Sequence, residues 1–137
     1  QCTALNSFDL YRNSISGSIP SEIGHCKELS YFDFFFNSLT GPIPSEIGQC
    51  RKLIMFSLHG NNVVGSIPSE IGQCKNLTKL DLRGNLLTGL IPNEIGELTK
   101  LQYLDMFQNN LIGAIPISLC NHGLNPAVDR NISCSCC

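Results

Sequence analysis

The residues of this chain that could carry acid–base or metal chemistry are acidic side chains that recur at one interval. Four carboxylates and a serine stand 24 residues apart, at Asp9, Asp33, Ser57, Asp81 and Asp105. Acid–base catalysis needs carboxylates in contrasting environments beside a pocket, whereas a repeated column gives its members the same environment. A calcium site needs more oxygen ligands than a flat column offers. This column therefore predicts neither catalysis nor a metal site.

Other signatures of catalysis are absent from the sequence. It contains no glycine-rich phosphate loop, no Ser-His-Asp set and no HExxH motif. Four glutamates that also recur every 24 residues are interpreted as a solvated face: Glu22, Glu46, Glu70 and Glu94. We therefore expect a protein that is not an enzyme and that needs no cofactor and no metal.

Four of the eight cysteines recur with the same interval, at Cys2, Cys26, Cys50 and Cys74. Leu98 takes the next position of this column, and a position that accepts Cys or Leu is an apolar core position. These cysteines are expected to be buried, unreactive thiols. Stacked units lie about 5 Å apart, so disulfides between neighbours are the alternative. Cys2 is retained as a disulfide candidate because no unit precedes it in this chain.

The other four cysteines lie near the C-terminal end, at Cys120, Cys134, Cys136 and Cys137. A dense cysteine cluster in a small repeat protein predicts disulfides, which indicate an oxidising, extracellular compartment. Zinc bound by His122 and several of these thiols is the alternative, but Cys-x-Cys-Cys matches no standard zinc spacing. If Cys120 pairs with one tail cysteine, another could join Cys2 of a neighbouring molecule.

Two Asn-x-Ser/Thr tripeptides begin at Asn76 and Asn131. Both are candidate N-glycosylation sites, which supports a secreted protein.

The elements that position these columns are five units, which begin at Leu5, Leu29, Leu53, Leu77 and Leu101. A fixed period of this length predicts stacked units that share one core. Two apolar residues stand two positions apart in each unit, as Phe8 and Leu10 do, which predicts a short strand with one buried face. An Asn follows in every unit and is expected to form a ladder that satisfies backbone groups: Asn13, Asn37, Asn61, Asn85 and Asn109. A Gly for a tight bend and an Ile-Pro pair that forbids a long helix complete the unit.

These columns match the pattern LxxLxLxxNxLxGxIPxxIG and resemble the plant-type leucine-rich repeats of receptor-kinase ectodomains and polygalacturonase-inhibitor-like proteins. The resemblance implies an α/β solenoid, right-handed, with a parallel β-sheet on its inner face and short 3-10 or irregular turns outside. We assign residues 1–124 to this solenoid and residues 125–137 to a Cys-rich cap, which looks similar to tails of algal secreted repeat proteins. The family pattern also implies local hydrogen bonding for the Asp column.

The resemblance places partner binding on the inner face. Outward strand positions and their neighbours supply aromatic side chains with one Arg and one His: Tyr11, Tyr31, Phe35, Phe36, His59, Arg83, Tyr103 and Phe107. Large side chains exposed on a rigid sheet typically mark a contact surface. Aromatic rings can stack on sugars or pack against a protein, and the sequence does not choose between these ligands.

Composition narrows the class of partner. An apolar content of 42% is enough for a narrow solenoid core, and a net charge of −2 gives no reason to expect nucleic acid. No apolar run approaches the roughly 18 residues of a membrane span. We therefore expect an extracellular protein, secreted or associated with a cell wall.

Two functions remain open from the sequence. The first is a secreted, non-catalytic module that binds a glycan, peptide or protein through its aromatic inner face. The second is a structural subunit that stacks head-to-tail into an extracellular filament, because the first unit starts mid-repeat and would expose Phe8 and Ile15. Missing upstream repeats or a stable uncapped end would also explain that start. Ice binding is disfavoured because its column is interrupted, at Ser16, Thr40, Val64, Thr88 and Ile112.

Overall fold

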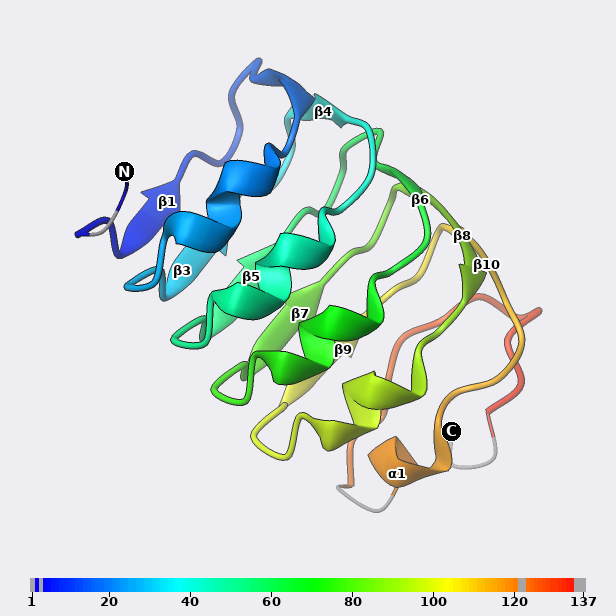
Figure 1. The fold of residues 1–137 in the computed structure, drawn as a ribbon. Helices are drawn as coiled ribbons and strands as arrows, with labels where there is room; N and C mark the ends of the chain where they lie inside the picture. The colour runs from blue at the N-terminus through cyan, green and yellow to red at the C-terminus, as the bar shows by residue number, and fades with distance from the viewer. Residues whose placement is uncertain (1, 3, 121–122, 135–137) are drawn as a thin grey trace.

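The computed structural model describes residues 2, 4–120 and 123–134 as a stack of five coils followed by a partial sixth (Figure 1). Each coil contains one strand, a second strand after a bend, and a short helical turn. The predicted α/β solenoid is therefore confirmed. No helix in the described part of the chain has the length and apolar character needed to cross a bilayer.

The first strand of every coil joins one parallel sheet, which we call the main sheet. Its strands are, in spatial order, β1 (Ser7–Asp9), β3 (Tyr31–Asp33), β5 (Met55–Ser57), β7 (Lys79–Asp81) and β9 (Tyr103–Asp105). The register equals one repeat, so Phe8 pairs with Phe32 and Phe32 pairs with Phe56. Equivalent residues of successive coils therefore stand side by side in rows across the sheet.

A second layer of strands lies after the bend of each coil, and the sequence pattern did not predict it. These strands are β2 (Ser16–Ser18), β4 (Ser38–Thr40), β6 (Val64–Gly65), β8 (Leu86–Leu90) and β10 (Asn110–Ile112). They form sheets β2-β4 and β10-β8-β6, connected by a bridge between Pro42 and Val64. The chain must turn sharply here, and Gly17 and Gly113 in this layer have φ of 93°.

The outer side of the first four coils is a 3-10 helix, as the family resemblance implied, and the proline of the preceding Ile-Pro pair is compatible with a short helix only. These helices are η1 (Ser21–His25), η2 (Ser45–Gln49), η3 (Ser69–Gln73) and η4 (Asn93–Glu97), and α1 (Ile117–Cys120) follows in the fifth coil. Each 3-10 helix follows an extended proline. A Cβ atom on Gly48 would collide with the backbone oxygen of Glu70, so glycine lets adjacent turns approach closely.

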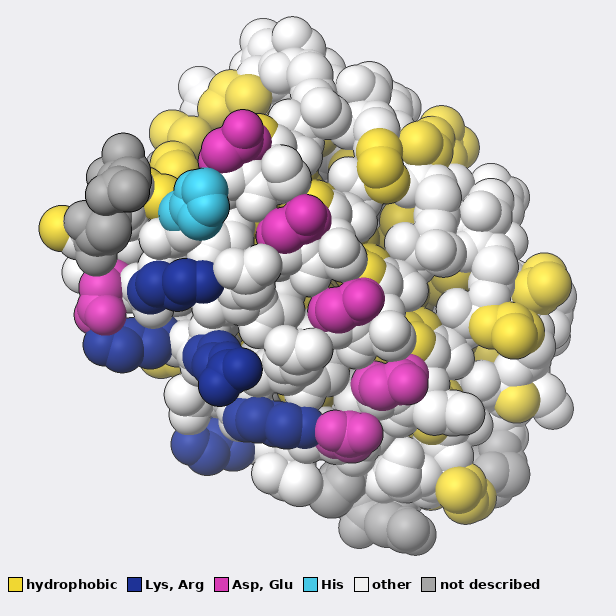
Figure 2. Space-filling model, viewed as in Figure 1, with side chains coloured by type: hydrophobic (Ala, Val, Ile, Leu, Met, Phe, Trp, Pro, Cys, Tyr) yellow, Lys and Arg dark blue, Asp and Glu magenta, His cyan; other side chains and the backbone are white. Residues whose placement is uncertain are grey.

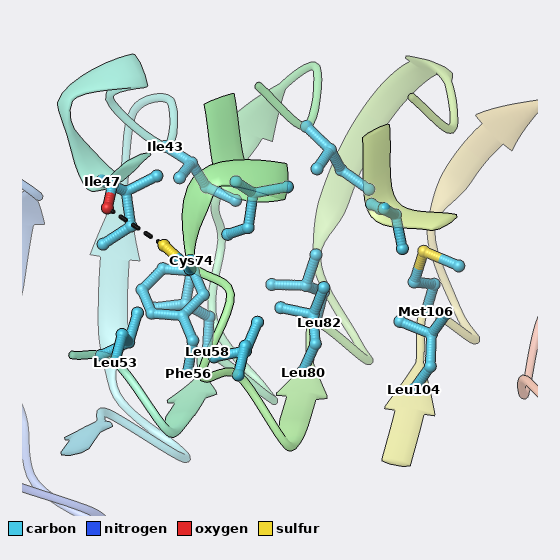
Figure 3. Close-up of a cluster of buried hydrophobic side chains, with 14 of the residues drawn as sticks. Ile43, Ile47, Leu53, Phe56, Leu58, Cys74, Leu80, Leu82, Leu104 and Met106 are labelled. Atoms are coloured by element: carbon cyan, nitrogen blue, oxygen red, sulfur yellow. Dashed lines mark hydrogen bonds between the residues drawn. The ribbon is translucent and has the colours of Figure 1, made fainter. Parts of the chain in front are cut away.

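The core is a continuous column of apolar side chains between the main sheet and the outer turns. Figure 3 shows Phe56 and Leu58 of one coil beside Leu80 and Leu82 of the next, and all four are fully buried. Burying one such side chain contributes about 2–3 kcal/mol to folding. Because each coil buries its apolar side chains against the neighbouring coil, this stabilisation depends on stacking.

The Asn side chains connect each coil to the one before it. The Oδ1 of Asn61 accepts a hydrogen bond from the N–H of Leu39 at 2.9 Å. Its Nδ2 donates to the carbonyl of Phe34 in the preceding coil and to that of Leu58 in its own, each at 2.9 Å. The same three-bond arrangement recurs at Asn37, Asn85 and Asn109. Asn13, in the first coil, donates to two carbonyl groups of its own coil instead.

The two ends of the stack differ. The first coil leaves an apolar groove of about 260 Å³, whose lining includes Phe8, Ile15, Phe32 and Leu39. At the other end the partial coil continues the backbone ladder, since the N–H of Met106 donates to the carbonyl of Ala127 at 2.8 Å. The boundary between residues 124 and 125 stays a prediction.

The cysteines depart from the expectation at one position. Cys26 was expected to be a free thiol, and this is wrong, because it forms a disulfide with Cys2 across stacked coils whose Cα atoms are 5.0 Å apart. Cys50 and Cys74 are free and buried, and each thiol donates to a carbonyl of the preceding coil. Toward the C-terminal end, Cys120 of α1 and Cys134 of the tail are disulfide-bonded. The other residues invoked there, His122, Cys136 and Cys137, lie outside the described residues.

Candidate functional site

The candidate site is the outward side of the main sheet, which we call the inner face. Side chains alternate along a strand, so the first and third residues of each strand point away from the core, as does the second residue after it. The structure leaves five of the predicted contact residues exposed: Tyr11, Tyr31, Phe36, Tyr103 and Phe107. The other three, Phe35, His59 and Arg83, are half-buried.

Three of these side chains form one aromatic cluster, the Phe–His cluster of Phe35, Phe36 and His59. The ring centroids of Phe35 and Phe36 are 4.4 Å apart, and that of His59 lies 4.8 Å from Phe35 and 5.1 Å from Phe36. The guanidinium of Arg12, from the preceding coil, stands 5.8 Å from the Phe35 centroid. The cluster therefore joins two coils, and Arg12 of a third coil holds a cation over one of its rings.

Phe36 occupies a backbone conformation that favours glycine. Its φ is 49°, and the equivalent positions in the next two coils are Gly60 and Gly84. A left-handed conformation costs a non-glycine residue about 1–2 kcal/mol. The Phe36 ring covers Gly60, where an added Cβ atom would collide with it. The sequence thus places an aromatic ring on the surface at a position where glycine would be less strained.

Cations of the fourth coil also lie over aromatic rings of the fifth coil. The guanidinium of Arg83 lies 5.8 Å from the Phe107 centroid, and the Nζ of Lys79 lies 5.1 Å from that of Tyr103. The Nε of Arg83 is buried, and it has no hydrogen-bond partner among the described residues. A buried donor without a partner is costly, and the half-buried guanidinium that carries it is suited to donate hydrogen bonds to a ligand's oxygen.

The acidic column makes the local hydrogen bonds that the family pattern implies. In three coils the carboxylate accepts from the N–H two residues later: Asp33 from Phe35 at 3.1 Å, Asp81 from Arg83 at 3.3 Å, and Asp105 from Phe107 at 2.9 Å. These bonds hold the chain where the candidate binding residues begin. The carboxylates therefore position the site's backbone.

Burial changes the titration of the central carboxylate. Asp81 is only 6% exposed, and this burial raises the pKa of its carboxyl group above 3.8. The N–H of Arg83 opposes this rise, as does His59, whose Nδ1 lies 4.0 Å from Asp81 Oδ2. Burial and the nearby charges of Asp81 and Asp105 raise the pKa of Tyr103, whose hydroxyl donates to Asp105 at 3.2 Å.

The two candidate glycosylation sites lie away from the Phe–His cluster. Asn76 lines a shallow hollow of about 530 Å³ at the start of the main-sheet strands. Its Nδ2 donates to the carbonyl of Arg51 at 3.0 Å, and its Oδ1 accepts from Lys100 at 2.7 Å. Asn131 is exposed in the tail and donates to the carbonyl of Leu111 at 2.7 Å. Glycosylation at either position stays a prediction.

The sequence interpretation left two cations out of the site. Lys79 stands in the same outward row as Tyr31 and Tyr103. Its place in the repeat was therefore enough to include it among the predicted contact residues. Arg12 itself has a positive φ of 52°, and its side chain lies over the ring of Phe35. The repeat pattern does not predict this side-chain direction. Among the residues that the structure describes, no group of three or more His, Cys, Asp or Glu could hold a metal ion.

Family models decide the classification of this fold. A model described as leucine rich repeat matches residues 51–111, and a second leucine rich repeat model matches residues 4–26 and 28–50. The chain belongs to the leucine-rich-repeat family. A comparison of this leucine-rich-repeat chain with curated proteins finds no match.

Solved structures similar to this leucine-rich-repeat chain include plant receptor ectodomains. One described as PEPR1–AtPEP1 is 36% identical with a TM-score of 0.89, over 97% of this chain and 19% of that chain. A second is the ectodomain of the plant membrane receptor kinase GASSHO1/SCHENGEN3 from Arabidopsis thaliana in complex with CASPARIAN STRIP INTEGRITY FACTOR 2. It is 37% identical with a TM-score of 0.86, over 94% of this chain and 16% of that chain. The Arabidopsis HAESA ectodomain with an IDA peptide hormone ligand is 37% identical with a TM-score of 0.86, over 90% of this chain and 21% of that chain.

This leucine-rich-repeat chain spans about a fifth of the length of these receptors, or less. The matches support the predicted plant-type, extracellular class of repeat. The likeness of the Cys-rich tail to algal proteins stays a prediction.

Proposed function

We propose that this chain is an extracellular, non-catalytic recognition module that binds an extended peptide or protein segment across its inner face. The observation that carries the proposal is the Phe–His cluster, whose rings are presented on adjacent coils of one sheet. Large aromatic side chains with Arg nearby are typical of residues that dominate binding energy. Two similar ectodomains are described in complex with a peptide hormone and with CASPARIAN STRIP INTEGRITY FACTOR 2, which supports this ligand class.

The packing of the rings favours a peptide over a glycan. A sugar stacks on a free aromatic face, whereas cations already lie over the rings of Phe35, Tyr103 and Phe107. The remaining ring edges match apolar side chains, and the half-buried guanidinium of Arg83 matches a carbonyl or carboxylate oxygen. An extended peptide supplies both kinds of group along one line.

A non-catalytic role is supported by the bonding of the inner-face carboxylates and by the burial of the free thiols. The carboxylates of Asp33, Asp81 and Asp105 accept backbone hydrogen bonds. The free thiols of Cys50 and Cys74 are buried, and burial raises the pKa of Cys74 to about 12, so the reactive thiolate is disfavoured.

The disulfides support an extracellular location. Cys2 and Cys26 are bonded to each other, and Cys120 and Cys134 are also disulfide-bonded. Such bonds persist in oxidising compartments and are rare in the cytosol.

The proposal predicts that removing one exposed ring weakens peptide binding without unfolding the protein. A phage-displayed random peptide library would be selected on the wild-type protein, and the selected peptides would be synthesised as probes. Phe36→Gly should weaken their binding by about tenfold or more, equivalent to about 1.4 kcal/mol, because the ring leaves the cluster while the backbone strain is relieved. Isothermal titration calorimetry would measure the change, and the free energy of unfolding should shift by less than about 1 kcal/mol.

Gln108→Gly is the matched control, because Gln108 also has a positive φ but carries no ring. Its peptide affinities should stay within about twofold of the wild type. Unchanged peptide binding by Phe36→Gly, or an equal loss in both variants, would contradict the proposal. Binding confined to a glycan array would replace the peptide with a sugar ligand.

Head-to-tail filament assembly is not part of this proposal. The apolar groove at the first coil is the feature that would serve it, and nothing in the described residues indicates what covers that groove. The comparisons give the filament no support.

A further inference from the structure

Positive side chains gather on one edge of the stack, which we call the basic edge. It consists of the last residue of each 3-10 helix and the segment that leads to the next main-sheet strand: residues 25–30, 49–54, 73–78 and 97–102. Five of the nine Lys and Arg residues lie here, all exposed: Lys27, Arg51, Lys52, Lys75 and Lys100. Figure 2 shows the basic side chains as one band beside the acidic side chains of the outer turns.

The cations of the basic edge outnumber its carboxylates. The edge contains only two carboxylates, Glu28 and Glu97, and each is bonded to one lysine, at 2.6 and 2.7 Å. Three cations have no carboxylate partner among the described residues: Lys27, Arg51 and Lys100. The edge is therefore strongly positive on a chain whose net charge is −2, and a surface of this kind attracts anions.

The spacing of the cations favours one kind of anion. Lys27, Arg51 and Lys75 occupy equivalent positions in three successive coils. In the column beside them the Cα atoms of Cys2 and Cys26 are 5.0 Å apart, so this row presents one cation about every 5 Å. Side chains on one face of an extended peptide are about 6.7 Å apart, because successive residues alternate sides. A linear polysaccharide with one carboxylate per sugar matches the row more closely, since its sugar unit is about as long as one coil is thick.

The hollow on this edge also suits a sugar better than a peptide. Lys52 and Lys100 contribute to the lining of its volume of about 530 Å³. The backbone N–H groups of Ile54 and Thr78 already donate to the carbonyls of Ser30 and Ile54, each at 2.8 Å, so a peptide finds no free N–H at these positions. The hydroxyl groups of Ser30 and Thr78 donate to backbone carbonyls, which leaves their oxygens able to accept hydrogen bonds from sugar hydroxyls.

From the charge, spacing and bonding of this edge we infer that it binds an acidic polysaccharide, a linear chain with one carboxylate per sugar. The cations bind the carboxylates, and the hollow holds a sugar ring between Lys52 and Lys100. The basic edge precedes the main-sheet strands, whereas Phe35 and His59 of the Phe–His cluster follow the ends of β3 and β5. This site is therefore separate from the proposed peptide site and goes beyond the proposed function.

The test is a titration with alginate oligomers, which are linear chains of uronates, in calcium-free buffer. The protein is produced in the bacterial periplasm, where disulfides form and Asn76 receives no glycan, because a glycan at Asn76 would cover the hollow that this residue lines. Isothermal titration calorimetry should show binding at an ionic strength of about 0.01 M. At about 0.15 M the dissociation constant should be at least about tenfold higher, because screening shortens the range of the attraction from about 30 Å to about 8 Å.

Two exposed arginines provide a matched pair of variants. Arg51→Gln removes a cation of the basic edge and should weaken alginate binding, and Arg51→Gln combined with Lys100→Gln should weaken it by at least about tenfold. Arg130→Gln is the control, because Arg130 is also exposed but lies past the ends of the main-sheet strands. Its affinity should stay within about twofold of the wild type. Glu28→Gln removes a repelling carboxylate and should strengthen binding, which a misfolded variant could not do.

Four results would overturn the inference. The first is no alginate binding by the wild type at the low ionic strength. The second is an affinity that Arg51→Gln combined with Lys100→Gln leaves unchanged, and the third is an equal loss in Arg130→Gln. The fourth is binding of polyglutamate with the same number of carboxylates as tightly as alginate, which would assign the edge to an acidic peptide. Phe36→Gly should bind alginate like the wild type, so this inference and the proposed function can fail separately.

Discussion

The amide of Asn61 satisfies backbone groups in two coils at once. Only 7% of this residue is exposed, and its three hydrogen-bond partners belong to Phe34, Leu39 and Leu58. Asn61→Ala removes all three bonds and leaves buried backbone groups unpaired. We expect it to lower the free energy of unfolding by about 1–3 kcal/mol, measured by urea denaturation.

Asn13→Ala is the control for Asn61→Ala, because Asn13 is exposed and bonds only to its own coil in the described structure. It should cost clearly less than Asn61→Ala. Equal losses in the free energy of unfolding would mean that neither burial nor bonding between coils determines how much an Asn of the ladder stabilises the fold.

At the same scale, Asp81 makes stability depend on pH. Burial raises its folded-state pKa above 3.8, so the folded protein holds this proton more tightly than the unfolded chain does. Its contribution to stability is therefore greatest below pH 3.8 and is lost as the pH rises through the folded pKa. Asp81→Asn keeps an acceptor for the N–H of Arg83 and removes the buried charge.

We expect Asp81→Asn to be more stable relative to the wild type at pH 7 than at pH 3.8, in urea denaturation at both values. Asp9→Asn, at the exposed member of the same column, is the matched control. A stability difference for Asp81→Asn that is the same at both pH values would disprove the assigned role of burial.

At the scale of elements, the disulfide between Cys2 and Cys26 holds the first coil on the stack. Repeat proteins unfold from their ends, and the first coil buries its apolar residues less completely than the central coils. Closing a loop of this length stabilises by about 3–4 kcal/mol in the chain-entropy model. Replacing both cysteines by serine should therefore cost about 2–4 kcal/mol and expose the first coil before the rest.

Hydrogen exchange would locate that loss. The N–H of Leu10 donates to the backbone carbonyl of Asp33 and should exchange faster in the double serine variant. The N–H of Leu58, which donates to the backbone carbonyl of Asp81, should stay protected. Uniform loss of protection would show that the disulfide supports the whole stack instead. No change at Leu10 would show that stacking alone holds the first coil.

At the scale of the molecule, two layers of strands give the stack two separate surfaces. The inner face combines aromatic rings, cations and buried carboxylates, whereas the second layer of strands, with the residues that flank it, carries no charged side chain. Because every coil repeats the same bend, each surface extends along the whole stack (Figure 1).

The sequence by itself determined the coil, its main strand and the side of that strand on which each residue lies. A period of 24 residues stacks equivalent positions in register. Alternation within one repeat assigns Phe56 to the core and His59 to the surface, and the same assignment holds for the equivalent residues of the other coils. The Ile-Pro pair likewise set the short outer turns, because proline prevents a long helix.

Only the tertiary structure decided which side chains meet between coils. The second strand layer pairs residues with an offset of 22, as between Ser16 and Ser38, which a period of 24 does not reveal. The contact of Arg12 with Phe35, and the bond of Cys2 to Cys26 while Cys50 stays free, depend on local backbone direction and side-chain reach. A repeat pattern fixes the face of each residue, whereas the pairing across coils depends on three-dimensional distances that the pattern does not contain.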